Sequence, residues 1–201
     1  MKATIILAGL ILMSCFANAQ DIKLNAPDKT GGKTVMEALS LRRTERTYVK
    51  KEMPVQMVSD LLWAANGFNR PTKRTAPTAM NKQETELYVM FDNGVYFYDA
   101  KENILKLVAK GDFRNTLGQQ NISDNASLSI IMVGDLDKSS EKWAAVTSGY
   151  ISQNIYLFAS AHDNIGTVAR GGGWKNEELK QILKLGDKQI ITLIQAVGYL
   201  K

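Results

Sequence analysis

Three arginines and one threonine gather within five residues of the chain, in the run Arg42, Arg43, Thr44, Glu45 and Arg46, called here the arginine run. Guanidinium groups keep their charge in any physiological buffer and hold phosphate oxygens through paired hydrogen bonds. The arginine run therefore has the chemistry to hold a phosphate and the carbonyl edge of a planar ring. A solvated basic helix end is the alternative interpretation.

A loop rich in hydroxyl and amide groups, residues 74–83, precedes a predicted strand and is called here the polar loop. Its Thr78, Asn81 and Gln83 supply both hydrogen-bond donors and acceptors. Such side chains can approach the polar edge of a planar ligand closely. An ordinary surface loop is the alternative.

A third cluster, called here the glycine turn, follows another predicted strand and consists of Arg170, Gly171, Gly172 and Gly173. Residues without a Cβ let backbone N–H groups approach a ligand closely. A plain turn between a strand and a helix explains the same residues equally well.

The chain has a single histidine, His162, and a single cysteine, Cys15, which excludes most hydrolytic and metal-based chemistry. Zinc sites and Ser-His-Asp triads need other side chains, and His162 is expected to be structural at a helix end. Two tryptophans, Trp63 and Trp143, and the tyrosines at helical or strand spacing are interpreted as core. A formal net charge of +5 is too small to indicate a nucleic-acid surface. Any redox chemistry must therefore belong to a bound cofactor.

The first 19 residues are predicted to be a signal peptide. One lysine precedes an apolar run that is too short to cross a bilayer core of about 30 Å, and Ala17-Asn18-Ala19 provides a cleavage signal before Gln20. We therefore expect an exported, periplasmic or extracytoplasmic protein without a stable membrane span. A lipoprotein acylated at Cys15 is the alternative. Residues 20–33 are polar and are expected to form a flexible leader before one domain over residues 34–201.

Hydrophobic periodicity predicts the elements that position the three clusters. Helices are expected over residues 34–41, 54–67, 141–162 and 176–185, the second with proline at its start and glycine at its end. Strands are expected over residues 86–91, 95–98, 104–108, 128–133, 165–169 and 190–199, and Asp92-Asn93-Gly94 predicts a hairpin turn between the first two. The irregular alternation of helices and strands indicates an α+β domain with a central mixed sheet.

Taken in order, the three clusters resemble motifs of the nitroreductase family of FMN-dependent oxidoreductases. Residues 42–46 match the family's Arg-Arg-Ser-x-Arg opening, and residues 77–83 match its Pro-Ser-x-x-Asn-x-Gln loop, both with threonine in place of serine. Gly171-Gly172 matches its late glycine turn. The sequence between these motifs is similar to the thiazoline-oxidase or SagB-type dehydrogenase branch, and the resemblance covers residues 37–199.

The resemblance implies a nitroreductase-like fold, with a central mixed, mostly antiparallel sheet flanked by helices. It also implies a homodimer that shares two FMN sites at its interface. The residues implied to hold the phosphate and the pyrimidine edge of the flavin are Arg42, Arg43, Thr44 and Arg46. Those implied to approach the flavin from the partner subunit are Thr78, Asn81 and Gln83. A backbone N–H that points at the flavin N5 is implied among Arg170, Gly171 and Gly172.

The function that the resemblance implies is two-electron, ping-pong transfer through the bound flavin to a nitro compound, a quinone or a related small-molecule acceptor. NAD(P)H is a candidate electron donor, and no side chain is expected to be catalytic, because the flavin carries the chemistry. Two alternatives stay open: dehydrogenation of thiazoline-like peptide rings, and flavin binding without catalysis. Arg170 stands where the branch often has an apolar residue, and it is interpreted as selecting anionic substrates or covering the flavin.

Overall fold

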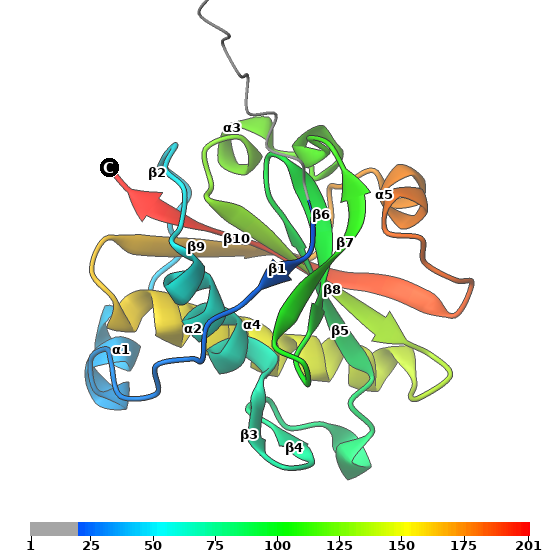
Figure 1. Ribbon diagram of the computed structural model, residues 1–201, viewed down its shortest axis with the longest axis horizontal. Helices are drawn as coiled ribbons and strands as arrows, with labels where there is room; N and C mark the ends of the chain where they lie inside the picture. The colour runs from blue at the N-terminus through cyan, green and yellow to red at the C-terminus, as the bar shows by residue number, and fades with distance from the viewer. Residues whose placement is uncertain (1–19) are drawn as a thin grey trace, which may run out of the picture.

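The computed structural model describes residues 20–201, which form one sheet covered by helices on both faces (Figure 1). The strands are β1 Ile22–Lys23, β2 Tyr48–Val49, β3 Phe68–Arg70, β4 Lys73–Arg74, β5 Thr85–Met90, β6 Gly94–Asp99, β7 Ile104–Lys110, β8 Leu128–Asp135, β9 Ile165–Arg170 and β10 Gln189–Leu200. The helices are α1 Val35–Leu41, α2 Val55–Asn66, α3 Gln120–Ser123, α4 Glu141–Ala161 and α5 Asn176–Ile182, with short 3-10 turns at Ala79–Asn81 and Arg114–Thr116.

The large sheet has the strand order β1-β7-β6-β5-β8-β10-β2, and β9 also pairs with β10. β3 and β4 form a separate two-stranded sheet. Every strand pairing within residues 20–201 is antiparallel. The predicted α+β class and mostly antiparallel sheet are confirmed, and the parallel pairs that a mixed sheet would add are not found in this part of the chain.

The centre of the sheet is buried on both faces, which explains the dense apolar run predicted as a strand. β8 has seven consecutive buried residues. On one face, α2 and α4 pack their apolar sides against β5 and β8, with Leu61 and Ile151 fully buried. On the other face, Leu117 and Leu179 pack against Ile131. A strand covered by helices on both sides has no polar face, so its sequence does not alternate.

Helix α1 leads directly into the arginine run. Thr34 caps α1, because its hydroxyl accepts from the Glu37 N–H at 3.3 Å while the Glu37 carboxylate accepts from the Thr34 N–H at 2.9 Å. α1 ends at Leu41, so the arginine run begins at its last turn.

Within residues 20–201, no helix has the length and apolarity needed to cross a membrane.

Most predicted elements lie where the sequence placed them, with small differences at their ends. The predicted hairpin is formed by β5 and β6, in which Met90 lies opposite Val95. α5 ends three residues earlier than predicted, at Ile182, and the next turn is closed by Lys184 with a left-handed φ of 55°. His162 has the expected structural role, because it caps α4 and its Nδ1 lies 2.8 Å from the Phe158 carbonyl oxygen.

Residues 20–33 pack along the fold, which corrects the expectation of a flexible leader. β1 pairs with the outer edge of β7, and Leu24 is 4% exposed in the main core. The Asp28 N–H donates to the Asp60 carboxylate of α2 at 2.7 Å. The physical reason is that β7 would otherwise be an open sheet edge, which even a two-residue strand can cover, while Ile22 packs against the main core. The predicted signal peptide, with the alternative lipid site at Cys15, lies outside the described residues.

Candidate functional site

The arginine run presents two cations that have no ion-pair partner within residues 20–201. Arg42 follows α1, is half-buried, and holds its guanidinium 5.4 Å from the centre of the Tyr156 ring. Arg46 is exposed at the end of the run. Arg43 differs from both, because its exposed guanidinium forms an ion pair with the Glu45 carboxylate. Positive charge is therefore available to a ligand at Arg42 and Arg46, whereas Arg43 already has a partner.

Backbone and side-chain hydrogen bonds tie the arginine run to the core of the fold. The Glu45 N–H donates to the carbonyl oxygen of Thr167 in β9 at 3.0 Å. The Tyr48 hydroxyl donates to the Glu45 carbonyl oxygen at 2.6 Å. Tyr48 is 3% exposed, and burial raises the pKa of its phenol well above the usual value. A neutral phenol at all physiological pH values keeps this donor available, so the run is held in one conformation.

Tyr156 of α4 connects the arginine run to the strand that carries the glycine turn. Its hydroxyl oxygen lies 3.2 Å from the Thr44 hydroxyl and accepts from the Ala169 N–H at 3.1 Å. Its ring lies beside the Arg42 guanidinium. Sequence analysis missed this residue, since a tyrosine at helical spacing was interpreted as core. The only signal that could have found it is its place directly after Gln153, Asn154 and Ile155, within the similarity to the SagB-type branch.

The side chain of Arg170 is buried, 7% exposed, and points into the protein rather than over a ligand. Its Nη1 donates to the carbonyl oxygens of Leu117 at 2.8 Å and Gly118 at 2.9 Å. Its Nε and Nη2 have no partner within the described chain, and burial lowers the pKa of the guanidinium. Nη1 therefore holds the loop at residues 117–118, and the interpretation that this side chain selects anionic substrates or covers the flavin stays a prediction.

That loop supports the glycine turn from behind. Gly118 has a φ of +67°, and a Cβ placed on it would lie 1.9 Å from the Gly173 carbonyl oxygen. The Lys175 N–H donates to the Thr116 carbonyl oxygen at 2.9 Å. Only a glycine at position 118 therefore permits this close approach of the two backbones. Arg170 thus holds the loop against which the turn that follows it is packed.

The outer side of the glycine turn is open. A Cβ on Gly172 or Gly173 would meet no atom within 4 Å, and Gly171 would meet only Leu193 at 3.9 Å. The N–H groups of Gly172 and Gly173 donate no hydrogen bond within residues 20–201. Open, unpaired backbone donors that follow the strand linked through Tyr156 to the arginine run are suited to an anionic or carbonyl-bearing ligand.

The polar loop lies apart from the other two clusters, and its hydrogen bonds stay within it or go to the neighbouring residues 63–72. Gln83 Nε2 donates to the Thr72 carbonyl oxygen at 2.9 Å, and Gln83 N–H donates to the Thr78 hydroxyl at 3.1 Å. Asn81 Nδ2 donates to the same Thr72 carbonyl at 3.2 Å. No hydrogen bond within the described residues joins this loop to the arginine run or the glycine turn. One subunit therefore brings two of the three predicted clusters together, and the third stands free to face another molecule.

The residues present fit a phosphate-bearing planar cofactor better than a metal ion. Within residues 20–201, no group of three or more histidine, cysteine, aspartate and glutamate residues is close enough to hold a metal. Arg42 and Arg46 offer charge for a phosphate, and the donors of Gly172 and Gly173 offer hydrogen bonds for a polar ring edge. The hydrogen-bond donors and cations present therefore match the phosphate and the polar ring edge of a cofactor such as FMN.

Comparisons with known proteins identify the same fold. A proposed nitroreductase from Ralstonia eutropha is 28% identical, with a TM-score of 0.83 over 91% of this chain and 90% of that chain. A proposed nitroreductase from Desulfovibrio desulfuricans, solved in complex with FMN, is 20% identical, with a TM-score of 0.60 over 84% of this chain and 87% of that chain. A chain of the E. coli microcin synthetase McbBCD complex with truncated pro-MccB17 is 15% identical, with a TM-score of 0.69 over 100% of this chain and 85% of that chain.

None of the curated proteins compared with this sequence matched it. The profile of the nitroreductase family, in contrast, matches residues 39–199. This range includes the whole arginine run, the polar loop and the glycine turn. This match spans most of the chain, and the fold agrees with it. The chain therefore belongs to the nitroreductase family.

Proposed function

We propose that the protein is an FMN-dependent oxidoreductase that passes two electrons from a donor to a nitro compound, a quinone or a related small acceptor. The observation that carries this proposal is that Tyr156 contacts Arg42 and Thr44 of the arginine run and also Ala169, at the end of the strand that leads into the open glycine turn. The FMN complex of the Desulfovibrio desulfuricans relative supports the choice of cofactor.

Bound FMN would supply the hydride-accepting ring, and the chain's own residues would bind and orient it. Arg42 and Arg46 would hold the phosphate and the pyrimidine edge, and Tyr156 fixes the Thr44 hydroxyl within the arginine run. The N–H groups of Gly172 and Gly173 are donors for the ring edge, where negative charge accumulates on reduction. Of the residues predicted to contact FMN, Arg43 is the least favoured, because its guanidinium already forms an ion pair with the Glu45 carboxylate.

A homodimer is part of this proposal. The polar loop lies apart from the arginine run within one subunit. The surface of the subunit also has several exposed large apolar side chains, among them Val35, Met36, Leu39, Met80, Trp143 and Tyr150. Met80, at the tip of the polar loop, is 89% exposed. A second copy that covers these side chains and brings Thr78, Asn81 and Gln83 to the flavin completes the site. A stable FMN-loaded monomer in sedimentation would contradict the shared site.

Export is proposed from the sequence alone. The mature chain would begin at Gln20, after the predicted signal peptide. Mass spectrometry of protein recovered from the cell envelope measures the first residue directly. A lipid-modified Cys15 at the N-terminus would replace this proposal with the lipoprotein alternative.

Spectroscopy of the purified protein tests the proposed activity. We expect flavin absorbance, bleaching by NADH, NADPH or dithionite, and recovery of the colour when a nitroaromatic compound or a quinone is added. A flavin that dithionite bleaches but that passes electrons to no acceptor would overturn the oxidoreductase proposal and leave flavin binding without catalysis. Turnover with a thiazoline-containing peptide, and with no nitro compound or quinone, would assign the chain to ring dehydrogenation.

A further inference from the structure

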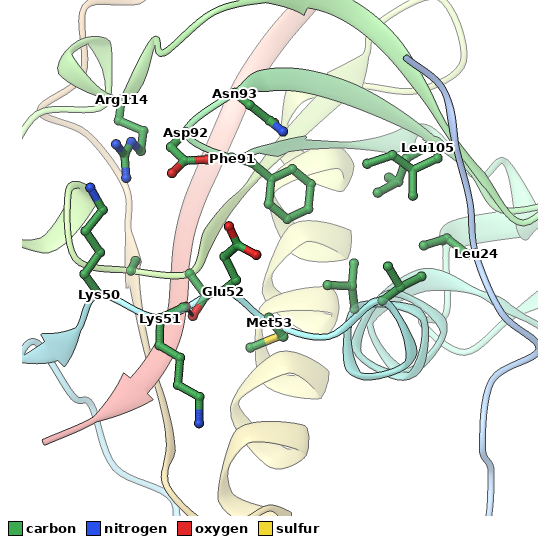
Figure 2. Close-up of a pocket in the computed structure, with 15 residues that line it drawn as sticks. Leu24, Lys50, Lys51, Glu52, Met53, Phe91, Asp92, Asn93, Leu105 and Arg114 are labelled. Carbon is green, nitrogen blue, oxygen red and sulfur yellow. Dashed lines mark hydrogen bonds between the residues drawn. The ribbon is translucent and has the colours of Figure 1, made fainter. Parts of the chain in front are cut away.

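A second cavity, of about 450 Å³, lies outside the proposed flavin site. Segment 50–55, the β5–β6 hairpin tip at residues 91–93 and strands β1 and β7 surround it, and it is called here the hairpin cavity (Figure 2). No residue of the arginine run, the polar loop or the glycine turn lines it. Its volume falls within the range of small-molecule sites, about 300 to 1,000 Å³.

The floor of the hairpin cavity is apolar. Leu24, Met53, Val58 and Leu105 line it, and each is less than 9% exposed. The half-buried ring of Phe91 forms one wall. β1 is part of the same boundary, so the folding of residues 20–25 against β7 is what closes this side of the cavity. Binding of a hydrocarbon or aromatic group here would remove its apolar surface from water, which favours binding.

Glu52 is the charged group that faces the interior. Figure 2 shows its side chain extending from segment 50–55 across the cavity toward Phe91. Its carboxylate has no hydrogen bond or ion pair within residues 20–201, and neither has the carboxylate of Asp92 at the hairpin tip beside it. Both carboxylates are exposed at the mouth, so a ligand can reach them.

The cations near the mouth are committed elsewhere or point away. The Arg114 guanidinium donates to both carboxylate oxygens of Asp112, at 2.9 and 2.6 Å, and to the Asp124 carbonyl oxygen at 3.1 Å. Lys51 holds its ammonium 4.2 Å from the centre of the Tyr199 ring, and Figure 2 shows it directed away from Phe91. Lys50 extends toward Arg114 rather than toward Phe91. The interior therefore presents negative charge beside an aromatic ring.

We propose that the hairpin cavity binds a small amphipathic cation, an amine or quaternary ammonium compound with an apolar body. The Glu52 carboxylate pairs with the cationic group, the Phe91 ring contributes a cation–π contact, and the apolar floor holds the body of the ligand. An anionic amphiphile would meet Glu52 and Asp92, whereas the lysines of the lining, Lys50 and Lys51, are not directed toward Phe91. The site is separate from the flavin, so ligand and cofactor bind at the same time.

Calorimetric titration of the purified protein tests this with three probes that share one body: phenylbutylammonium, phenylbutanol and phenylbutyrate. We expect the ammonium to bind about tenfold more tightly than the alcohol, from one ion pair and one cation–π contact, and the carboxylate to bind most weakly. Glu52→Gln should weaken the binding of phenylbutylammonium about fivefold and leave the affinity for phenylbutanol unchanged. Lys50→Gln, the matched control of opposite charge, should leave the preference for the ammonium intact.

Val55→Trp places a large ring at the mouth, where Val55 is 43% exposed and the fold tolerates the added volume. This variant should block all three probes while its circular dichroism and flavin absorbance stay those of the wild type. Tighter binding of phenylbutyrate than of phenylbutylammonium would overturn the assignment of a cation. Equal binding of the ammonium to wild type and Glu52→Gln would do the same, and absence of binding by every probe would overturn the site itself.

Discussion

Arg170→Met tests how the glycine turn is positioned. Methionine keeps an unbranched side chain of similar length at a site that is 7% exposed, but it removes the charge and the bonds to the carbonyl oxygens of Leu117 and Gly118. These bonds hold the loop whose Gly118 packs against Gly173. The substitution should therefore loosen the turn without opening a large cavity.

The change in unfolding free energy is the difference between two opposing effects. Two hydrogen bonds from a charged donor contribute about 3 to 6 kcal/mol together. Against this, the buried guanidinium leaves its Nε and Nη2 without partners, which costs several kcal/mol. The two effects nearly cancel, so we expect Arg170→Met to change the unfolding free energy by less than about 2 kcal/mol. FMN affinity should fall about tenfold, since a loosened turn must be ordered again when the cofactor binds.

The assay is FMN titration followed by fluorescence, together with urea unfolding of the same sample. Arg114→Met is the matched control, because Arg114 is a second buried arginine, 9% exposed, whose side-chain donors pair with Asp112 and the Asp124 carbonyl oxygen and not with the carbonyl oxygens of residues 117–118. Since none of its donors is left without a partner, it should lose more stability than Arg170→Met, about 3 kcal/mol, and keep the wild-type FMN affinity. If Arg170→Met binds FMN as tightly as wild type, the turn does not depend on this guanidinium and the reasoning fails.

Three further predictions concern the arginine run and the core. Arg42→Ala should weaken FMN binding by about ten- to a hundredfold through loss of a charge-assisted contact, whereas Arg70→Ala, an exposed arginine on the β3–β4 hairpin, should leave the titration unchanged. Tyr156→Phe keeps the ring beside Arg42 but removes the hydroxyl that joins Thr44 to β9, and should weaken FMN binding by about three- to tenfold with intact circular dichroism. Burial raises the pKa of the Tyr98 phenol from 10.0 to about 12. On raising the pH, the phenol therefore ionises in the unfolded state before it ionises in the folded state, and the unfolding free energy should fall between pH 10 and pH 12. Tyr98→Phe should show a shallower fall over this range in urea unfolding experiments.

The elements that could be predicted from the sequence are those with local signals. α2 is marked by Pro54 and Gly67, the β5–β6 hairpin by Asn93-Gly94, and the buried strand β8 by an unbroken apolar run. The arginine run could be found because its chemistry is contiguous. Each of these signals operates over fewer than about 20 residues, which is the range in which backbone preference and side-chain periodicity act.

The parts that could not be predicted depend on partners far apart in the chain. β1 is only two residues long, Ile22 and Lys23, and nothing in its own sequence shows that β7 needs an edge partner. Tyr156 acquires its role only when α4 brings its hydroxyl to Thr44 and Ala169. Arg170 could be singled out as an unusual cation, but the direction of its side chain depends on the loop at residues 117–118.

The support that the arginine run receives from the core has a consequence for binding. Arg42 and Arg46 have no ion-pair partner within the described chain, so nothing of that kind fixes their side chains. The bonds from Tyr48 to Glu45 and from Glu45 to Thr167 fix the backbone between these two arginines instead. The fold therefore positions both cations before a ligand arrives, and an anionic cofactor that pairs with them loses less affinity to ordering this segment. Stability and cofactor binding are linked in this way, because a ligand that recognises this arrangement binds the folded state in preference to the unfolded state.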